Sequence, residues 1–371
     1  MNEPVTRPPV FSTSPGWTRV LLPLSHVYGR VAAWRRHRVT ACSTRLEVPV
    51  VSVGNLTVGG TGKTPAVEWV TRRLSGLGRK PAILSRGYGR PRGSGANGQS
   101  ANGNDEFLVL LENLPDVPHI QNPSRVKSGR EAIAGGADVL VLDDGFQHFA
   151  LHRDLDIVLI DAVNPFGFGR VLPAGMLREP LETLEIANLI VVTRGSSCHP
   201  RKFATLKSFL KDRFPRVAYA EMDFEPRSWV TIGGEDARGP NDEQPLENFR
   251  NLDVVAFCGI GNPEGFRRQL ERLELRVLDW LPFRDHYRYT QLDLERIAGR
   301  ARELEAAAVI MTQKDAVKVR GELSRGHPCP EIPWSFLSIE PRVTEGEKVF
   351  ERLLEECLTR SHPQAPNPRS P

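Results

Sequence analysis

The sequence predicts an α/β fold: a doubly wound parallel sheet, a second and smaller α/β domain, and an amphipathic helix before both. Short runs rich in β-branched residues alternate with helical patterns along most of the 371 residues, which is typical of parallel strands joined by crossover helices. The alternation stops at a polar stretch near residues 233–248 and then resumes, which indicates a second unit.

The first predicted element is a basic helix. Six arginines and no acidic residue lie between Trp17 and Arg45. Apolar residues in this stretch recur at spacings of three and four, which places them on one helical face. They are Val20, Leu24, Val27, Val31 and Trp34. Such a helix either lies in a bilayer interface with its arginines near anionic headgroups, or packs on the protein core with its basic face in water.

A buried strand is predicted at residues 48–53, followed by the loop NLTVGGTGKTP at 55–65, a helix and a further strand at 81–85. The loop matches a phosphate-binding loop, except that Thr57 stands where that motif begins with glycine. In such loops backbone N–H groups cradle phosphate, a lysine neutralises the β- and γ-phosphates and a hydroxyl ligates Mg²⁺. Because a strand precedes and a helix follows, we predict a P-loop NTPase fold. The predicted nucleotide-binding residues are Thr57, Val58, Gly59, Gly60, Thr61, Gly62, Lys63 and Thr64.

The following segments extend the first domain. A low-complexity stretch at 93–104 predicts a mobile loop, and helices are expected at 105–113 and 125–135. The predicted strand at 138–142 ends in Asp143 and Asp144, and strands at 155–160 and 188–193 continue the sheet. P-loop proteins place an acid at the end of a second buried strand to hold Mg²⁺ or its water. Either aspartate satisfies this pattern, so the choice between them stays open.

Beyond residue 218 the pattern changes. Alternating residues at 219–232 favour an exposed antiparallel strand, and strands near 254–263 and 306–315 begin and continue the second α/β unit. The proline-rich end is expected to be disordered. The predicted divisions are a membrane-interface helix at 1–46, a P-loop domain at 47–218, linker strands at 219–248, a smaller α/β domain at 249–358 and a tail at 359–371.

Composition excludes several classes of protein. Five scattered cysteines with no CxxC pair predict neither a disulfide framework nor a zinc site, and they favour a reducing compartment. We find no run of 18 apolar residues and no signal-peptide pattern, so we expect no membrane-spanning or exported segment. The net charge of +4 resides largely in the apolar-faced helix, which argues against a nucleic-acid partner. No obligate protein partner is evident.

Motifs along nearly the whole chain, from about residue 21 to residue 358, resemble the tetraacyldisaccharide 4'-kinase family. They are LLPLSHVYGR at 21–30, GNLTVGGTGKTP at 54–65, LSRGYGR at 84–90, DE at 105–106, DDGFQH at 143–148, LPAGMLREP at 172–180, VVTR at 191–194, GIGNP at 259–263, DHYRYT at 285–290 and TQKDAVK at 312–318. The resemblance makes Thr57 a family trait. It implies transfer of the γ-phosphate of ATP, with Mg²⁺, to the 4'-hydroxyl of an acylated glucosamine disaccharide 1-phosphate lipid, giving lipid IVA. It also implies a peripheral (monotopic) protein at the cytoplasmic face of the bacterial inner membrane, docked through the first helix.

The same resemblance assigns site residues. Asp105 matches the family's catalytic aspartate, which would accept the hydroxyl proton, and His286 of the second domain matches its partner. The active site would then lie between two domains that close around substrate. From the residues alone, Asp105 is equally a helix cap and His286 a turn residue. Glu106, Arg178 and Glu179 would complete the polar site, with Arg178 as a phosphate clamp.

One feature of the sequence departs from the family pattern. Asn104 and Phe107 replace a glycine and a proline that commonly flank the family's Asp-Glu pair. A regulatory P-loop NTPase of the deviant type, acting as a partner-binding switch, is the alternative function. Its loops usually read KGGxGK[ST], whereas Val58 stands here at the position of the signature lysine. A guanine-specific switch would carry NKxD, and TQKD at 312–315 has its lysine one place late.

Overall fold

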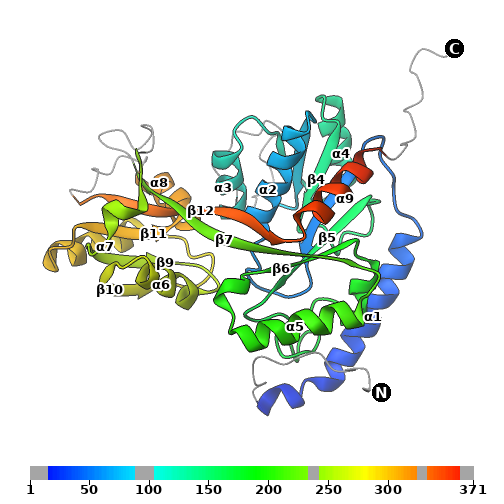
Figure 1. The fold of residues 1–371 in the computed structure, drawn as a ribbon, viewed down its shortest axis with the longest axis horizontal. Helices are drawn as coiled ribbons and strands as arrows, with labels where there is room; N and C mark the ends of the chain where they lie inside the picture. The colour runs from blue at the N-terminus through cyan, green and yellow to red at the C-terminus, as the bar shows by residue number, and fades with distance from the viewer. Residues whose placement is uncertain (1–15, 88–103, 233–241, 324–331, 360–371) are drawn as a thin grey trace. The chain divides into compact units, whose positions relative to one another are not determined.

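The computed structural model describes residues 16–87, 104–232, 242–323 and 332–359 (Figure 1). The predicted loop at 93–103, the first 15 residues and the tail from 360 lie outside the described residues. The described chain forms two compact units. Unit 1 holds residues 16–87, 114–224 and 341–359, and unit 2 holds the described residues within 104–113 and 225–340.

Unit 1 is built on the predicted parallel sheet, in the strand order β7-β6-β5-β1-β4-β2-β3. Every residue of β1, β2, β4, β5 and β6 is buried, which explains why these segments are continuous apolar runs in the sequence. The strands are β1 (Val50–Asn55), β2 (Pro81–Ser85), β3 (His119–Gln121), β4 (Val139–Asp143), β5 (Leu155–Asp161), β6 (Leu189–Thr193) and β7 (Ala218–Thr231).

Helices cover both faces of this sheet. On one face, Ala132 of α4 packs with Leu140 and Leu142 of β4, and α5 packs on β5 and β6 of the same face. Helix α2 packs on β1, β2 and β4 without joining either of those clusters, so it covers the opposite face. The helices are η1 (Gly16–Arg19), α1 (Leu22–Thr40), α2 (Lys63–Gly76), α4 (Arg125–Ala134), η2 (Leu181–Ile186), η3 (Gly195–Ser197), α5 (Pro200–Arg213) and α9 (Glu347–Thr359).

Unit 2 is a smaller α/β unit whose parallel strands follow the order β10-β9-β11-β12. Its core contains Phe257, Tyr289, Trp334 and Phe336. Strands β7 and β12 each begin in one unit and end in the other. The elements are α3 (Asp105–Asn113), β8 (Asp242–Gln244), η4 (Leu246–Phe249), β9 (Asp253–Cys258), α6 (Pro263–Arg272), β10 (Arg276–Pro282), α7 (Gln291–Glu303), β11 (Ala308–Thr312), α8 (Gln313–Leu323) and β12 (Trp334–Glu345).

Two features differ from the sequence prediction. Helix α3 clusters with unit 2, although its place in the sequence put it in the P-loop domain. The reason is a set of side-chain contacts with α8, including an ion pair of 2.8 Å between Glu112 and Arg320. Strand β7, predicted as an exposed antiparallel strand, pairs in parallel with β6 over residues 218–222 and in antiparallel with β8 over residues 229–231, so its first residues extend the parallel sheet.

Gly54 is required by the packing of β1 against the segment after β4. A Cβ atom at Gly54 would lie 2.7 Å from the backbone nitrogen of Phe146, a residue with no exposed surface. We therefore expect Gly54→Ala to destabilise the protein by about 1–3 kcal/mol, because backbone must shift to admit the methyl group. Gly76→Ala is the matched control, since nothing lies within 4 Å of its Cβ position. Chemical denaturation of both variants checks this, and equal stability would contradict it.

Candidate functional site

The loop between β1 and α2 has the backbone of a phosphate-binding loop. Gly59 and Gly62 adopt φ values of +126° and +84°, which side chains rarely tolerate. A Cβ atom at Gly62 would also lie 2.2 Å from the ring of Phe224. Thr57 is buried, and its carbonyl accepts a hydrogen bond of 2.8 Å from the side chain of Asn55. The threonine at the non-matching position therefore lies in a well-bonded turn.

Lys63, the first residue of α2, is held beside the end of β4. Its Nζ donates to Asn55 Oδ1 at 3.2 Å and lies 3.7 Å from Asp144 Oδ1. Arg178 Nη1 donates to both oxygens of Asp144, at 3.0 and 2.8 Å. Burial alone would raise the pKa of Asp144, but the charges of Lys63 and Arg178 outweigh burial and hold that pKa below its usual value. Asp144 therefore stays ionised as the counter-charge of both cations.

Hard oxygen donors for Mg²⁺ lie at the same edge of the sheet. Thr64 is buried in the first turn of α2, and Asp143 ends β4 in register with Val53 of β1. No group of three or more His, Cys, Asp or Glu side chains able to hold a metal occurs among the described residues. Mg²⁺ commonly takes only one or two protein ligands and completes its shell with phosphates and water, so this donor set fits it.

Arg178 and Glu179 follow a loop that packs against the P-loop. The Arg178 N–H donates to the carbonyl of Leu56 at 2.7 Å. Buried Glu179 accepts a hydrogen bond of 3.1 Å from Arg36 of α1, and burial raises the pKa of Glu179 despite that partner. Both residues belong to unit 1, whereas Glu106 belongs to unit 2, where it pairs with Lys314 at 3.0 Å. Of the three residues predicted to complete the polar site, two therefore belong to unit 1 and one to unit 2.

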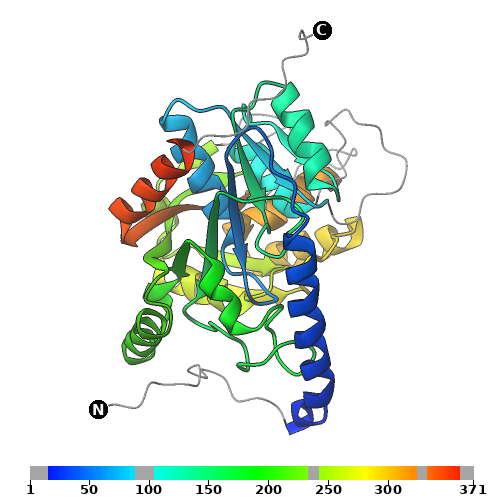
Figure 2. The same ribbon diagram turned by 90° about the vertical axis from the view of Figure 1, so that its right-hand side faces the viewer.

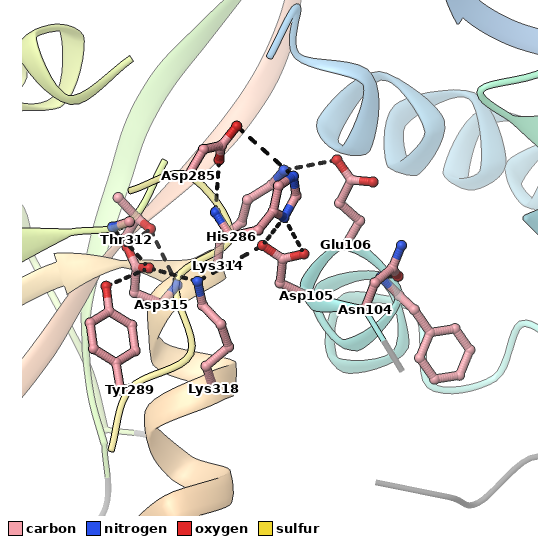
Figure 3. Close-up of polar contacts among 12 residues, drawn as sticks. Asn104, Asp105, Glu106, Asp285, His286, Tyr289, Thr312, Lys314, Asp315 and Lys318 are labelled. Atoms are coloured by element: carbon pink, nitrogen blue, oxygen red, sulfur yellow. Dashed lines mark hydrogen bonds and ion pairs between the residues drawn. The ribbon is translucent and has the colours of Figure 1, made fainter. Parts of the chain in front are cut away.

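Asp105 and His286 come together within unit 2 (Figure 3). The His286 Nδ1 atom lies 3.0 Å from each carboxylate oxygen of Asp105. Asp105 is buried in the first turn of α3, whereas the side chain of His286 is 57% exposed. His286 adopts φ of +57°, in a turn where its N–H donates to the carbonyl of Gly259. The helix cap is not Asp105 but Asn104, whose Oδ1 accepts from the N–H of Phe107 at 2.9 Å.

The Asp105–His286 pair changes the pKa of both members. Burial alone would raise the pKa of Asp105, but the hydrogen bond from His286 and the lysine charges hold it below its usual value. The hydrogen bond to Asp105 raises the pKa of His286 above its usual value, although burial opposes this. The charged pair is therefore most stable between these two pKa values, and it weakens as the pH rises through that of His286.

A second carboxylate supports this pair, and the sequence prediction did not assign it. Asp315 has no exposed surface and accepts hydrogen bonds from Tyr289, Thr312 and the N–H of Gly259 (Figure 3). Lys318 lies 3.0 Å from Asp315 and 3.9 Å from Asp105. The signal was present in the motif TQKDAVK, which places two lysines and an acid in the first turns of a helix after a buried strand.

Helix α1 exposes its apolar face. The side of α1 that contacts the rest of unit 1 is small or polar: Ser25 is buried and accepts from the N–H of Ala174, and Tyr28 donates to the carbonyl of Arg178. The five apolar residues predicted to share a face are all exposed, by 55–78%. The core-packed interpretation of that face was therefore wrong.

No helix within the described ranges is both long enough and apolar enough to cross a bilayer. Figure 2 shows α1 along its length.

Comparisons with known proteins agree with this geometry. A family model described as tetraacyldisaccharide-1-P 4'-kinase matches residues 17–359. A tetraacyldisaccharide 4'-kinase of Anaeromyxobacter sp. (strain K) is 38% identical over 338 residues, covering 89% of this chain and 87% of the relative. One of Syntrophus aciditrophicus is 37% identical, covering 85% and 86%. The crystal structure of "apo" form LpxK from Aquifex aeolicus in complex with ATP superposes with a TM-score of 0.72 at 29% identity, over 92% of this chain and 99% of that one.

The elevated pKa of His286 can be measured directly. We expect Asp105→Asn to lower it toward the ordinary value of about 6.5, because the variant removes the negative charge that favours the imidazolium. Asp285→Asn should lower it less, since the Asp285 carboxylate lies 3.9 Å from the imidazole Nε2 and makes its hydrogen bond of 3.1 Å to the backbone N–H of His286. NMR titration of the histidine ring protons, assigned with His286→Gln, gives both values. An Asp285 effect as large as that of Asp105 would refute the pairing.

Proposed function

The chain belongs to the tetraacyldisaccharide-1-P 4'-kinase family, and from this premise we propose how it acts. It transfers the γ-phosphate of ATP to the 4'-hydroxyl of an acylated glucosamine disaccharide 1-phosphate lipid. The product is the 1,4'-bisphosphate, lipid IVA, in the biosynthesis of lipid A. The observation that carries the proposal is the contact of 3.0 Å between Asp105 and His286, because phosphoryl transfer to an alcohol needs a proton acceptor and a nucleotide switch does not.

The residues of unit 1 support the role of binding the triphosphate. The N–H groups of residues 59–62 and the start of α2 favour anionic phosphate, and Lys63 supplies a positive charge for the β- and γ-phosphates. Thr64 and Asp143 would hold Mg²⁺, which when bound neutralises charge on those phosphates. We assign the acidic ligand to Asp143 because it is the buried last residue of β4, the strand paired with β1. Arg178 and Glu179 shape the adjoining loop.

The pair in unit 2 supports the role of proton acceptor. As the sugar oxygen bonds to the γ-phosphorus and the bond to the β,γ-bridging oxygen breaks, the hydroxyl proton passes to the ionised Asp105. His286 orients that carboxylate through Nδ1 and stabilises its charge. The P-loop belongs to unit 1 and this pair to unit 2.

Helix α1 supports binding to a membrane surface. A lipid with four acyl chains stays in its bilayer, so the enzyme must approach the headgroup from the cytoplasmic face of the bacterial inner membrane. The exposed residues Val20, Leu24, Val27, Val31 and Trp34 can enter the acyl boundary. Arg30, Arg35 and Arg38 of the same helix are exposed and suit anionic headgroups. The partner-binding switch is not favoured, since the relatives from Anaeromyxobacter and Syntrophus are both named as kinases.

The activity is tested with the purified chain, Mg-ATP and the disaccharide 1-phosphate in detergent micelles, followed by mass spectrometry of the lipid. We expect one added phosphate with ATP. Lys63→Ala should lower turnover by at least about a hundredfold, because the transferred group loses its counter-charge. Lys80→Ala, at an exposed lysine of the same unit, is the control and should keep its turnover. Turnover of GTP without lipid phosphorylation would favour the switch instead.

Membrane docking is tested by flotation with vesicles of phosphatidylethanolamine and phosphatidylglycerol. We expect the double variant Val27→Ser and Val31→Ser to bind these vesicles at least about tenfold more weakly, because two exposed side chains lose their burial in acyl chains. Leu292→Ser is the control, because Leu292 is 74% exposed in unit 2. Unchanged binding of the double variant, or equal loss in the control, would remove α1 as the docking surface.

A further inference from the structure

Two residues at the end of strand β6 bind the backbone of the phosphate loop. Thr193 Oγ1 donates to the carbonyl oxygen of Thr61 at 2.9 Å. Arg194 Nη2 donates to the carbonyl oxygen of Gly60. Two consecutive side chains therefore hold two consecutive loop carbonyls, and all four residues belong to unit 1. Neither Thr193 nor Arg194 was among the predicted site residues.

These two carbonyls determine where two N–H groups point. A trans peptide is planar, so its C=O and N–H point in opposite directions. The carbonyl of Gly60 shares a peptide with the N–H of Thr61, and the carbonyl of Thr61 shares one with the N–H of Gly62. A phosphate cradle requires such N–H groups to converge on the anion. The donors that hold the carbonyls of Gly60 and Thr61 therefore also fix the direction of the N–H groups of Thr61 and Gly62, which point the opposite way.

The arginine is itself held in place. Arg194 adopts φ of +59° and its N–H donates to the carbonyl of Met222 at 3.1 Å. Its Nη2 also pairs with Asp161 Oδ2 at 2.6 Å, at the end of β5. Asp161 Oδ1 accepts from the N–H of Val163 at 3.1 Å. Thr193 has no exposed surface, so its hydroxyl depends on the carbonyls of Thr61 and Ile160 as acceptors.

We propose that Thr193 and Arg194 are positioning residues that pre-organise the loop for the β- and γ-phosphates of a nucleoside triphosphate, with Asp161 fixing the arginine. The proposal rests on the proposed function, since it specifies how the same loop binds its nucleotide. Because the loop is ordered before the ligand arrives, binding does not bear the cost of ordering it. Loss of either donor should therefore weaken nucleotide binding more than it slows transfer from the bound state.

The test compares Thr193→Val and Arg194→Met with the wild-type chain. Valine is close to threonine in shape, and methionine keeps much of the arginine stem, but neither can donate. We expect each variant to raise the Kd and KM for Mg-ATP about tenfold. The KM for the lipid acceptor should stay unchanged, and kcat should change less than threefold. Thr193→Ser restores the hydroxyl and should restore ATP binding.

Thr71→Val is the matched control. Thr71 is also fully buried in unit 1, and its hydroxyl donates to a backbone carbonyl, that of Val67, at 2.7 Å. That carbonyl lies in α2 and not in the phosphate loop, so ATP binding should keep its wild-type strength. Should Arg194→Met fail to fold, Asp161→Asn removes the charge that holds the arginine and should raise the Kd for ATP in the same direction.

Three outcomes decide the matter. A Kd for ATP that rises in the two variants and recovers in Thr193→Ser supports the positioning role. Variants that melt at lower temperature without nucleotide, yet bind ATP as the wild type does, refute it and leave a purely structural role. A wild-type chain that binds no Mg-ATP refutes the proposed function itself, which keeps the two failures distinct.

Discussion

The parallel pairing of β1 with β4 and β5 is the constraint on which unit 1 depends. Val53 lies in register with Asp143, and Asn55 lies in register with Leu159. Parallel strands deliver their carboxyl ends to one edge of a sheet, so the phosphate loop, the acids after β4 and the end of β5 all arrive there. Charged groups at this edge pair with one another: Lys63 at the start of α2 lies 3.7 Å from Asp144 after β4, and Asp161 at the end of β5 pairs with Arg194 after β6.

The sequence predicted the buried strands well because burial on both faces leaves a continuous apolar run, as in VLVL of β4 and LIVV of β6. It gave no sign of β3, which has three residues and none fully buried. It also misplaced α3. That helix carries an ordinary amphipathic pattern, and its membership of unit 2 depends on contacts with α8 some 200 residues away, such as Glu106 with Lys314. No local pattern encodes which distant helix will meet a given face.

The residues of the candidate site also differ in how far the sequence could assign them. Local geometry defines the phosphate loop, so Gly62 and Lys63 could be assigned from spacing and context alone. Asp105 and His286 are 181 residues apart, and only family resemblance linked them. Neither route assigned a role to Arg194. Its side chain binds a backbone carbonyl oxygen, that of Gly60, and because every residue has such an oxygen, the sequence does not show which one an arginine will bind. Side chains that bind backbone carry little signature of their own in a sequence.

The two departures from the family pattern at the start of α3 compensate each other. A proline as the third residue of a helix has no backbone N–H that needs an acceptor. The residue before the helix can then be a glycine, which has no side chain to supply one. Phe107 brings an N–H that needs an acceptor, and Asn104 supplies it through Oδ1 at 2.9 Å. Because Asn104 caps the helix, Asp105 is spared that task and both of its oxygens remain near His286 Nδ1. Asn104 and Phe107 thus complete the start of α3 without drawing on the carboxylate that we propose as the proton acceptor.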